Sequence, residues 1–167
     1  RKNIAGLIYA YNRLRDDNVT LVDLQLVLAG ANGWRNRGIY RAWEESPYRR
    51  DIKFLGYVSP REKELLYRRA ETFIYPSYYE GFGLPPLEAM ARDLPVITSN
   101  VSSLPEVVGS AALAVNPHDI NEIAKALELV STDTDLREKL IKAGREQIRL
   151  FSWEKTAKQY LELFKSL

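Results

Sequence analysis

A segment in the middle of the chain, from Glu80 to Glu88, constrains the fold more than any other part of the sequence. It follows the apolar run Thr72-Phe73-Ile74-Tyr75 and leads into Leu87-Glu88-Ala89-Met90-Ala91-Arg92, an order that predicts a strand, a glycine loop and a helix. Gly81 and Gly83 let the backbone approach a ligand closely, and the two prolines that follow suit a first helical turn. Because the free N–H groups at a helix start attract negative charge, the segment predicts an anion site.

Two carboxylates, Glu80 and Glu88, lie on either side of this loop. They cannot share one helix face, so we expect them to bind different parts of one extended ligand, such as a nucleotide sugar with its phosphates over the loop. Each charge-assisted hydrogen bond would contribute about 1.5–3 kcal/mol. The spacing alone leaves a purely structural alternative open, in which Glu80 ends a strand, Glu88 stabilises the helix start and the glycines only turn the chain.

The run from Tyr75 to Ala91 resembles the signature of retaining nucleotide-sugar glycosyltransferases of family 4, a Glu followed by seven residues and a second Glu. The resemblance implies the C-terminal half of the two-domain GT-B architecture. We therefore expect an α/β fold with a Rossmann-like parallel sheet covered by helices on both faces. Residues 1–167 would form a single nucleotide-sugar-binding domain, a fragment that lacks its first strand and the N-terminal acceptor-binding domain.

The resemblance also implies a role for individual residues. Glu80 would contact the donor sugar and Glu88 the ribose hydroxyls. The loop that holds the diphosphate would consist of Gly81, Phe82, Gly83 and Leu84. Lys2 matches a family lysine that grips the diphosphate, and Val58 lies in the loop that touches the nucleobase in the family. Without the resemblance, Lys2 would be read as a solvated terminal charge and Val58 as part of a turn between a strand and a helix.

The implied activity is transfer of a sugar from a nucleotide-diphosphate sugar to a glycan, lipid or other acceptor, with the anomeric configuration kept. The style of the loop favours GDP-mannose as donor, and UDP-linked sugars are the alternative. No metal or other cofactor is implied, and we expect the chain alone to bind nucleotide without turnover. A noncatalytic nucleotide-binding or partner-interaction module is the rival interpretation.

Composition narrows the chemistry. The 167 residues contain no cysteine and one histidine, His118, which excludes thiol catalysis and disfavours histidine-based metal sites and catalytic triads. A formal net charge of +2 gives no ground to expect nucleic acid as a partner. We expect a soluble cytoplasmic domain, with peripheral association of the full enzyme at the inner face of the membrane as a further option.

Several further segments have two interpretations. Residues 34–50 mix arginine with aromatic residues, which favours a helix with its rings packed inward, or alternatively an RNA- or membrane-binding surface. Asp133-Thr134-Asp135 is similar to a metal motif of another glycosyltransferase fold, but its place before a helical pattern favours a cap. His118 is expected to be a loop residue. The apolar patterns predict strands over residues 21–29, 52–55, 94–98 and 111–115, and amphipathic helices over residues 4–15 and most of the chain after 120.

Overall fold

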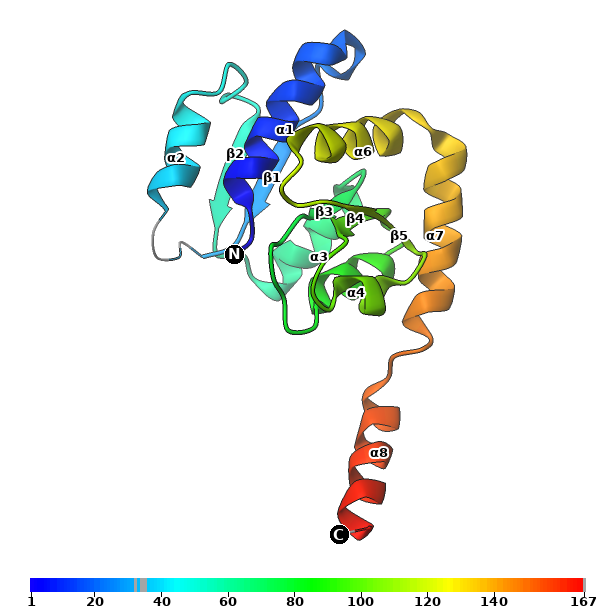
Figure 1. Ribbon diagram of the computed structural model, residues 1–167. Helices are drawn as coiled ribbons and strands as arrows, with labels where there is room; N and C mark the ends of the chain where they lie inside the picture. Colours follow the sequence, from blue (N-terminus) through cyan, green and yellow to red (C-terminus); the bar gives the residue numbers. More distant parts are fainter. Residues whose placement is uncertain (32, 34–35, 167) are drawn as a thin grey trace.

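The computed structural model describes residues 1–31, 33 and 36–166, and it shows an α/β fold built on parallel strands (Figure 1). A two-stranded sheet pairs β1 with β2, and a three-stranded sheet has the order β3-β4-β5. Every pairing is parallel. The strands are β1 (Leu26–Ala29), β2 (Ile52–Gly56), β3 (Phe73–Tyr75), β4 (Val96–Ser99) and β5 (Ala112–Val115). The predicted α/β class is confirmed.

Helices flank the sheets on both sides (Figure 1). They are α1 (Ile4–Asp17), α2 (Arg37–Glu44), α3 (Pro60–Arg69), α4 (Leu84–Met90), α5 (Leu104–Val108), α6 (Ile120–Thr132), α7 (Thr134–Ile148) and α8 (Trp153–Lys165). Helices α1 and α6 pack against each other, and α4 packs against α7. Asp133 caps α7 by accepting a hydrogen bond from the backbone N–H of Leu136, as the capping interpretation predicts.

Strand β4 lies between the two parts of the core and is buried along its whole length. Val96 faces a cluster that contains Tyr67 and Met90, whereas Ile97 faces the cluster formed by α1, α6 and strands of both sheets. Successive side chains of a strand point to opposite faces, so both faces of β4 are dry. A continuous apolar run such as Leu94-Pro95-Val96-Ile97 is the sequence pattern of a strand covered on both sides.

The prediction of one long strand over residues 21–29 is wrong in its first half. A 3-10 helix occupies Val19–Leu21, and the strand begins only at Leu26. The Asn18 side chain accepts a hydrogen bond from the backbone N–H of Thr20, which holds this turn. The Leu24 carbonyl accepts hydrogen bonds from Tyr11 and Arg15 of α1, so it is not available to a strand ladder.

The arginine- and aromatic-rich segment packs its described rings inward. Trp43 lies edge-on to Phe54 of β2, with ring centroids 5.8 Å apart, and donates a hydrogen bond from its indole N–H to the Arg49 carbonyl. The Tyr48 hydroxyl donates to Asp16 of α1. Trp34 and Arg35 lie outside the described residues. The described part of the segment therefore favours the packed helix over a ring-lined binding surface.

The last helix, α8, extends away from the rest of the molecule (Figure 1). Its apolar face is exposed, with Trp153 at 80%, Tyr160 at 59% and Phe164 at 66% of full exposure. Within the described residues, no helix combines the length and apolarity that crossing a membrane requires.

Candidate functional site

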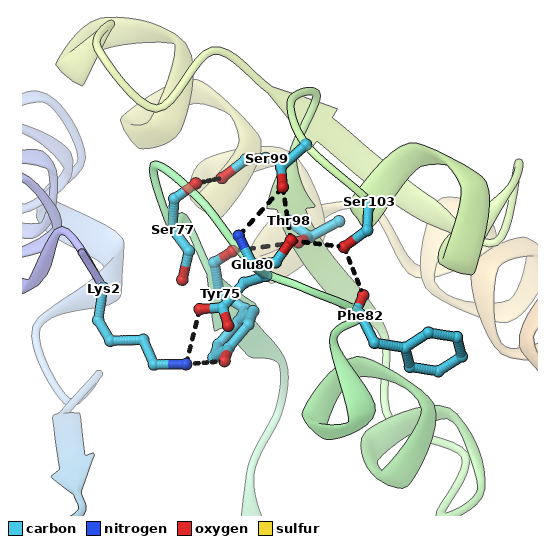
Figure 2. A network of polar contacts seen from close by, with 9 residues as sticks. Lys2, Tyr75, Ser77, Glu80, Phe82, Thr98, Ser99 and Ser103 are labelled. Atoms are coloured by element: carbon cyan, nitrogen blue, oxygen red, sulfur yellow. Dashed lines mark hydrogen bonds and ion pairs between the residues drawn. The ribbon is translucent and has the colours of Figure 1, made fainter.

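The centre of the site is an ion pair between two of the predicted site residues, Lys2 and Glu80. The Lys2 ammonium lies 2.6 Å from Oε1 of Glu80, although 78 positions separate them in the chain. The same ammonium donates to the Tyr75 hydroxyl and lies 4.4 Å from the centroid of the Tyr75 ring (Figure 2). Lys2 reaches this point because it lies two residues before the first residue of α1, and the buried face of α1 fixes that helix against the core.

The electrostatics of this pair keep both groups charged. Burial is the largest single influence on the pKa of Glu80 and raises it, but several hydrogen bonds, led by the one with Lys2, and the charge of Lys2 together outweigh burial, so the pKa lies below its ordinary value. Burial lowers the pKa of Lys2, and the Glu80 carboxylate and Tyr75 together raise it above its ordinary value. Glu80 is 8% exposed, which makes an unpaired carboxylate costly there.

The depressed pKa of Glu80 predicts a specific contribution to acid unfolding. Because the folded pKa is lower than the unfolded one, the contribution is present above the unfolded pKa of about 4.3 and is lost as the pH falls through the folded pKa. We expect Glu80→Gln to flatten the decline in the free energy of unfolding between about pH 5 and pH 2. Urea titrations across this range measure the effect. Glu138→Gln, an exposed control on α7, should retain the wild-type decline, and an equal decline in Glu80→Gln would contradict the assignment.

Serine hydroxyls after β4 hold the backbone of the loop that begins at Glu80. The Ser102 hydroxyl donates to the Glu80 carbonyl at 2.6 Å and accepts from the Glu80 N–H at 3.1 Å. The Ser103 hydroxyl lies 2.8 Å from the Phe82 carbonyl and 2.9 Å from the Glu80 carbonyl (Figure 2). The carboxyl ends of parallel strands meet at one sheet edge, so the turns after β3 and β4 are neighbours and can bond in this way.

The amides of Gly81, Phe82 and Gly83 find no hydrogen-bond acceptor among the described residues. Gly83 precedes α4 in a left-handed conformation, with φ at 107°, and no side chain caps the helix. Pro85 and Pro86 occupy its first turn and carry no N–H, as the sequence predicts. Since α4 has only seven residues, the loop amides, rather than a long helix dipole, supply the donors for an anion.

Phe82 contributes its backbone to this loop but not its ring. The ring lies edge-on to Phe151, with centroids 5.8 Å apart, and points away from Lys2 and Glu80 (Figure 2). Leu84, the first residue of α4, is exposed.

Glu88 lies on α4 and is bound by α3. Both of its carboxylate oxygens are 2.9 Å from the Lys63 ammonium, and Oε2 also accepts from the Tyr67 hydroxyl at 3.1 Å. Val58 lies in the loop two residues after β2 ends, directly before Ser59, which caps α3. The structure thus brings Lys2 and Glu80 into contact and places Glu88 separately, on the far side of the glycine loop in the chain, with lysine and tyrosine partners of its own.

Sequence reasoning missed Tyr75, Lys63 and the two serines that hold the loop. Ser102-Ser103 follows a predicted strand in a polar turn, and two hydroxyls at a strand's carboxyl end are a signal that could have identified them. Lys63 and Tyr67 are spaced i and i+4, so they share a helix face, but no pattern in the sequence pairs that face with Glu88.

Comparison with known proteins identifies the family of this chain. The family described as "Glycosyl transferases group 1" matches residues 1–147. The O-antigen chain mannosyltransferase B of Escherichia coli is 41% identical over the 167 residues, and the match covers all of this chain and 43% of that protein. The Escherichia coli serotype-specific mannosyltransferase WbdA is 34% identical over 167 residues, with 20% of its length covered.

One solved structure is similar to this chain over the whole length of the chain. The sucrose-phosphate synthase of Thermosynechococcus elongatus superposes with a TM-score of 0.84 at 31% identity, over all of this chain and 43% of that one. The chain therefore spans less than half the length of each of these three proteins.

Proposed function

Because the chain belongs to the group 1 glycosyl transferases, we propose that it is the donor-binding part of a retaining glycosyltransferase of family 4. The observation that carries the proposal is the loop between the two carboxylates, whose amides at Gly81, Phe82 and Gly83 have no acceptor among the described residues. Backbone N–H groups left open in this way are a site for the diphosphate of a nucleotide sugar. Two carboxylates beside it can accept hydrogen bonds from sugar hydroxyls.

We propose for the site residues the roles that the family resemblance implies, and their positions in the structure support this assignment. Glu80, buried at one end of the loop, would contact the donor sugar. Glu88, with 37% of its side chain exposed, would accept hydrogen bonds from the ribose hydroxyls. The Lys2 ammonium, which lies beside Glu80, would also interact with the diphosphate. Val58, in the loop that follows β2, would touch the nucleobase.

In the proposed reaction the bond between the anomeric carbon and the diphosphate oxygen breaks, and a bond from the acceptor oxygen to that carbon forms on the same face. The acceptor hydroxyl gives its proton to the leaving diphosphate. The loop amides and Lys2 stabilise the negative charge that develops on the leaving group, which is where such donors accelerate a reaction most. We propose that no dedicated metal is required.

Two relatives support mannose as the transferred sugar, because both are named as mannosyltransferases of Escherichia coli. This favours GDP-mannose as the donor, with UDP-linked sugars as the alternative. The same relatives are more than twice as long as this chain, which supports a second, acceptor-binding domain in the complete enzyme.

Two features of the fold are consistent with that larger enzyme. Strands of both sheets contribute to one core, yet β1-β2 and β3-β4-β5 are not joined by hydrogen bonds in the described residues. A further parallel strand between them would complete one continuous sheet. The exposed apolar face of α8 would be covered by the acceptor-binding domain, since a contiguous apolar surface of this kind usually marks a contact.

The proposal for α8 predicts that Phe164→Ser affects stability differently in two proteins. One is the chain alone, and the other is a chimera in which the N-terminal part of the 41% identical relative precedes residue 1. Phe164→Ser should leave the thermal midpoint of the chain alone within about 2 °C, because the ring is already exposed. In the chimera the same change should lower the free energy of unfolding by about 1–3 kcal/mol, because a ring buried against the second domain would be lost. Calorimetric melting of both proteins measures it, and an equally small effect in the chimera would contradict the contact.

Transfer by that chimera tests the proposed function. GDP-mannose should release GDP when a mannan-type acceptor is added, and the product should carry the sugar in the α configuration, which the one-bond carbon–proton coupling constant of the anomeric carbon reports. UDP-glucose and ADP-glucose serve as comparison donors, and EDTA should leave the rate unchanged. A β product would exclude the retaining mechanism, and release from UDP-glucose alone would exclude GDP-mannose.

A further inference from the structure

Helix α3 presents two donors to the carboxylate of Glu88. Lys63 and Tyr67 are four residues apart, so both side chains project from the same face of the helix toward α4. The Lys63 ammonium lies 2.9 Å from each oxygen of Glu88, and the Tyr67 hydroxyl lies 3.1 Å from Oε2. Tyr67 is the buried residue of α3, whereas Lys63 is not buried.

The two donors differ in how firmly they are held. Tyr67 is 8% exposed, its ring lies edge-on to Phe73 with centroids 5.5 Å apart, and the Arg92 guanidinium lies 5.3 Å from its centroid. Burial and the neighbouring Glu88 carboxylate raise the pKa of Tyr67 well above its ordinary value, so it remains a hydroxyl donor. Lys63, by contrast, has 43% of its side chain exposed and can move.

The number of acceptor sites on Glu88 limits what can bind there. A carboxylate has about four lone-pair sites, and Lys63 and Tyr67 together make three hydrogen bonds to it. Two neighbouring hydroxyls that both donate to Glu88 need two sites. The mobile ammonium of Lys63 must therefore release one carboxylate oxygen, while the buried Tyr67 keeps its bond.

An ammonium that has released one bond has a proton to donate, and a ribose hydroxyl that donates to Glu88 still has lone pairs to accept it. We propose that Lys63 is a specificity-determining residue for the ribose of the donor, acting with Glu88 so that one ribose hydroxyl donates to the carboxylate and accepts from the ammonium. This inference rests on the proposed role of Glu88 in ribose binding. A deoxyribose would lack the hydroxyl that bridges Glu88 and Lys63.

The test compares ribonucleotide with deoxyribonucleotide binding by titration calorimetry. The probe is whichever of ADP, GDP and UDP the wild-type chain binds most tightly, together with its 2′-deoxy and 3′-deoxy forms. We expect the wild type to prefer the ribonucleotide over at least one deoxy form by about tenfold or more. Lys63→Met should reduce that preference by about threefold or more, with the remaining preference supplied by Glu88, and should leave the affinity for the deoxy form nearly unchanged. Lys63→Arg should retain most of the preference.

Two controls separate this role from others. Arg61→Met removes a positive charge from an exposed position on the same helix and should keep the wild-type preference. The double variant Glu88→Ala/Lys63→Met should bind nucleotide no more weakly than Glu88→Ala alone, because the effects of two residues that act on the same hydroxyl are not additive.

Each other outcome overturns the proposal in a distinguishable way. Equal loss for both nucleotides would make Lys63 a general charge for the phosphates, and tighter ribonucleotide binding in Lys63→Met would make it a competitor of the ribose. An unchanged preference would make its contact with Glu88 structural only. If the wild type bound nucleotide without distinguishing ribose from deoxyribose, the ribose role of Glu88 would fail with it. Absence of nucleotide binding altogether would instead count against the proposed function.

Discussion

Replacing Glu88 with alanine is expected to weaken binding of the preferred nucleoside diphosphate by about 10- to 150-fold, which corresponds to about 1.5–3 kcal/mol. The loss arises because the variant cannot accept the charge-assisted hydrogen bonds of the ribose hydroxyls. Unfolding does not explain it, since the pair of Glu88 and Lys63 is more than a third exposed and such pairs contribute about 0–1 kcal/mol to stability. Titration calorimetry at fixed ionic strength measures the affinity.

The matched control is Glu106→Ala, which removes an exposed glutamate from α5, the helix that follows the loop-binding serines. It should bind nucleotide as the wild type does. Glu80→Gln should affect free nucleotide little and reduce mainly the additional affinity that an attached sugar provides. If Glu80→Gln weakened free nucleotide as much as Glu88→Ala, the division of roles between the two carboxylates would be wrong.

The second large effect is expected at Gly83, the residue that turns the loop into α4. A side chain there meets two penalties. The left-handed backbone, with φ at 107°, costs an L-residue about 1–2 kcal/mol. The new Cβ would also lie 2.6 Å from Cδ2 of Leu104, which is 0% exposed and has little room to move. We expect Gly83→Ala to lower the free energy of unfolding by about 2–4 kcal/mol and the thermal midpoint by on the order of 10 °C.

Gly81→Ala provides the comparison in the same loop. No heavy atom lies within 4 Å of a Cβ at that position, and its backbone is outside the left-handed region. Its stability should remain within about 1 kcal/mol of the wild type. Scanning calorimetry of the two variants distinguishes a geometric requirement at Gly83 from a general preference for glycine in the loop. Equal thermal midpoints of the two variants would indicate the general preference.

Much of the fold could be predicted because its signals are local. The continuous apolar run that became β4, the glycine loop before α4 and the aspartate cap of α7 each reveal their structure within a few residues. The predicted start of β1 is wrong because the contacts that determine it are not local. Residues 21–24 fit a strand by their pattern, but the Leu24 carbonyl accepts hydrogen bonds from Tyr11 and Arg15 of α1. Such a contact with a helix elsewhere in the chain is not visible in the local sequence pattern.

The candidate site divides in the same way. Glu80, the loop glycines and Glu88 could be identified because they are adjacent in the chain and match a specific signature. Lys2 could be placed only through the resemblance, and its ion pair with Glu80 spans 78 positions. Lys63 could not be identified, because its partnership with Glu88 depends on how α3 packs beside α4 rather than on any spacing in the sequence.

The most direct test of the donor-binding claim is titration of ADP, GDP and UDP, each with and without its sugar, into the chain and into the chimera that supplies the preceding domain. We predict that one nucleoside diphosphate binds selectively, that its sugar-linked form binds at least as well, and that Glu88→Ala removes most of the affinity. Absence of binding to both the chain and the folded chimera, with any of the three nucleotides, would contradict the claim and favour a noncatalytic partner-binding role.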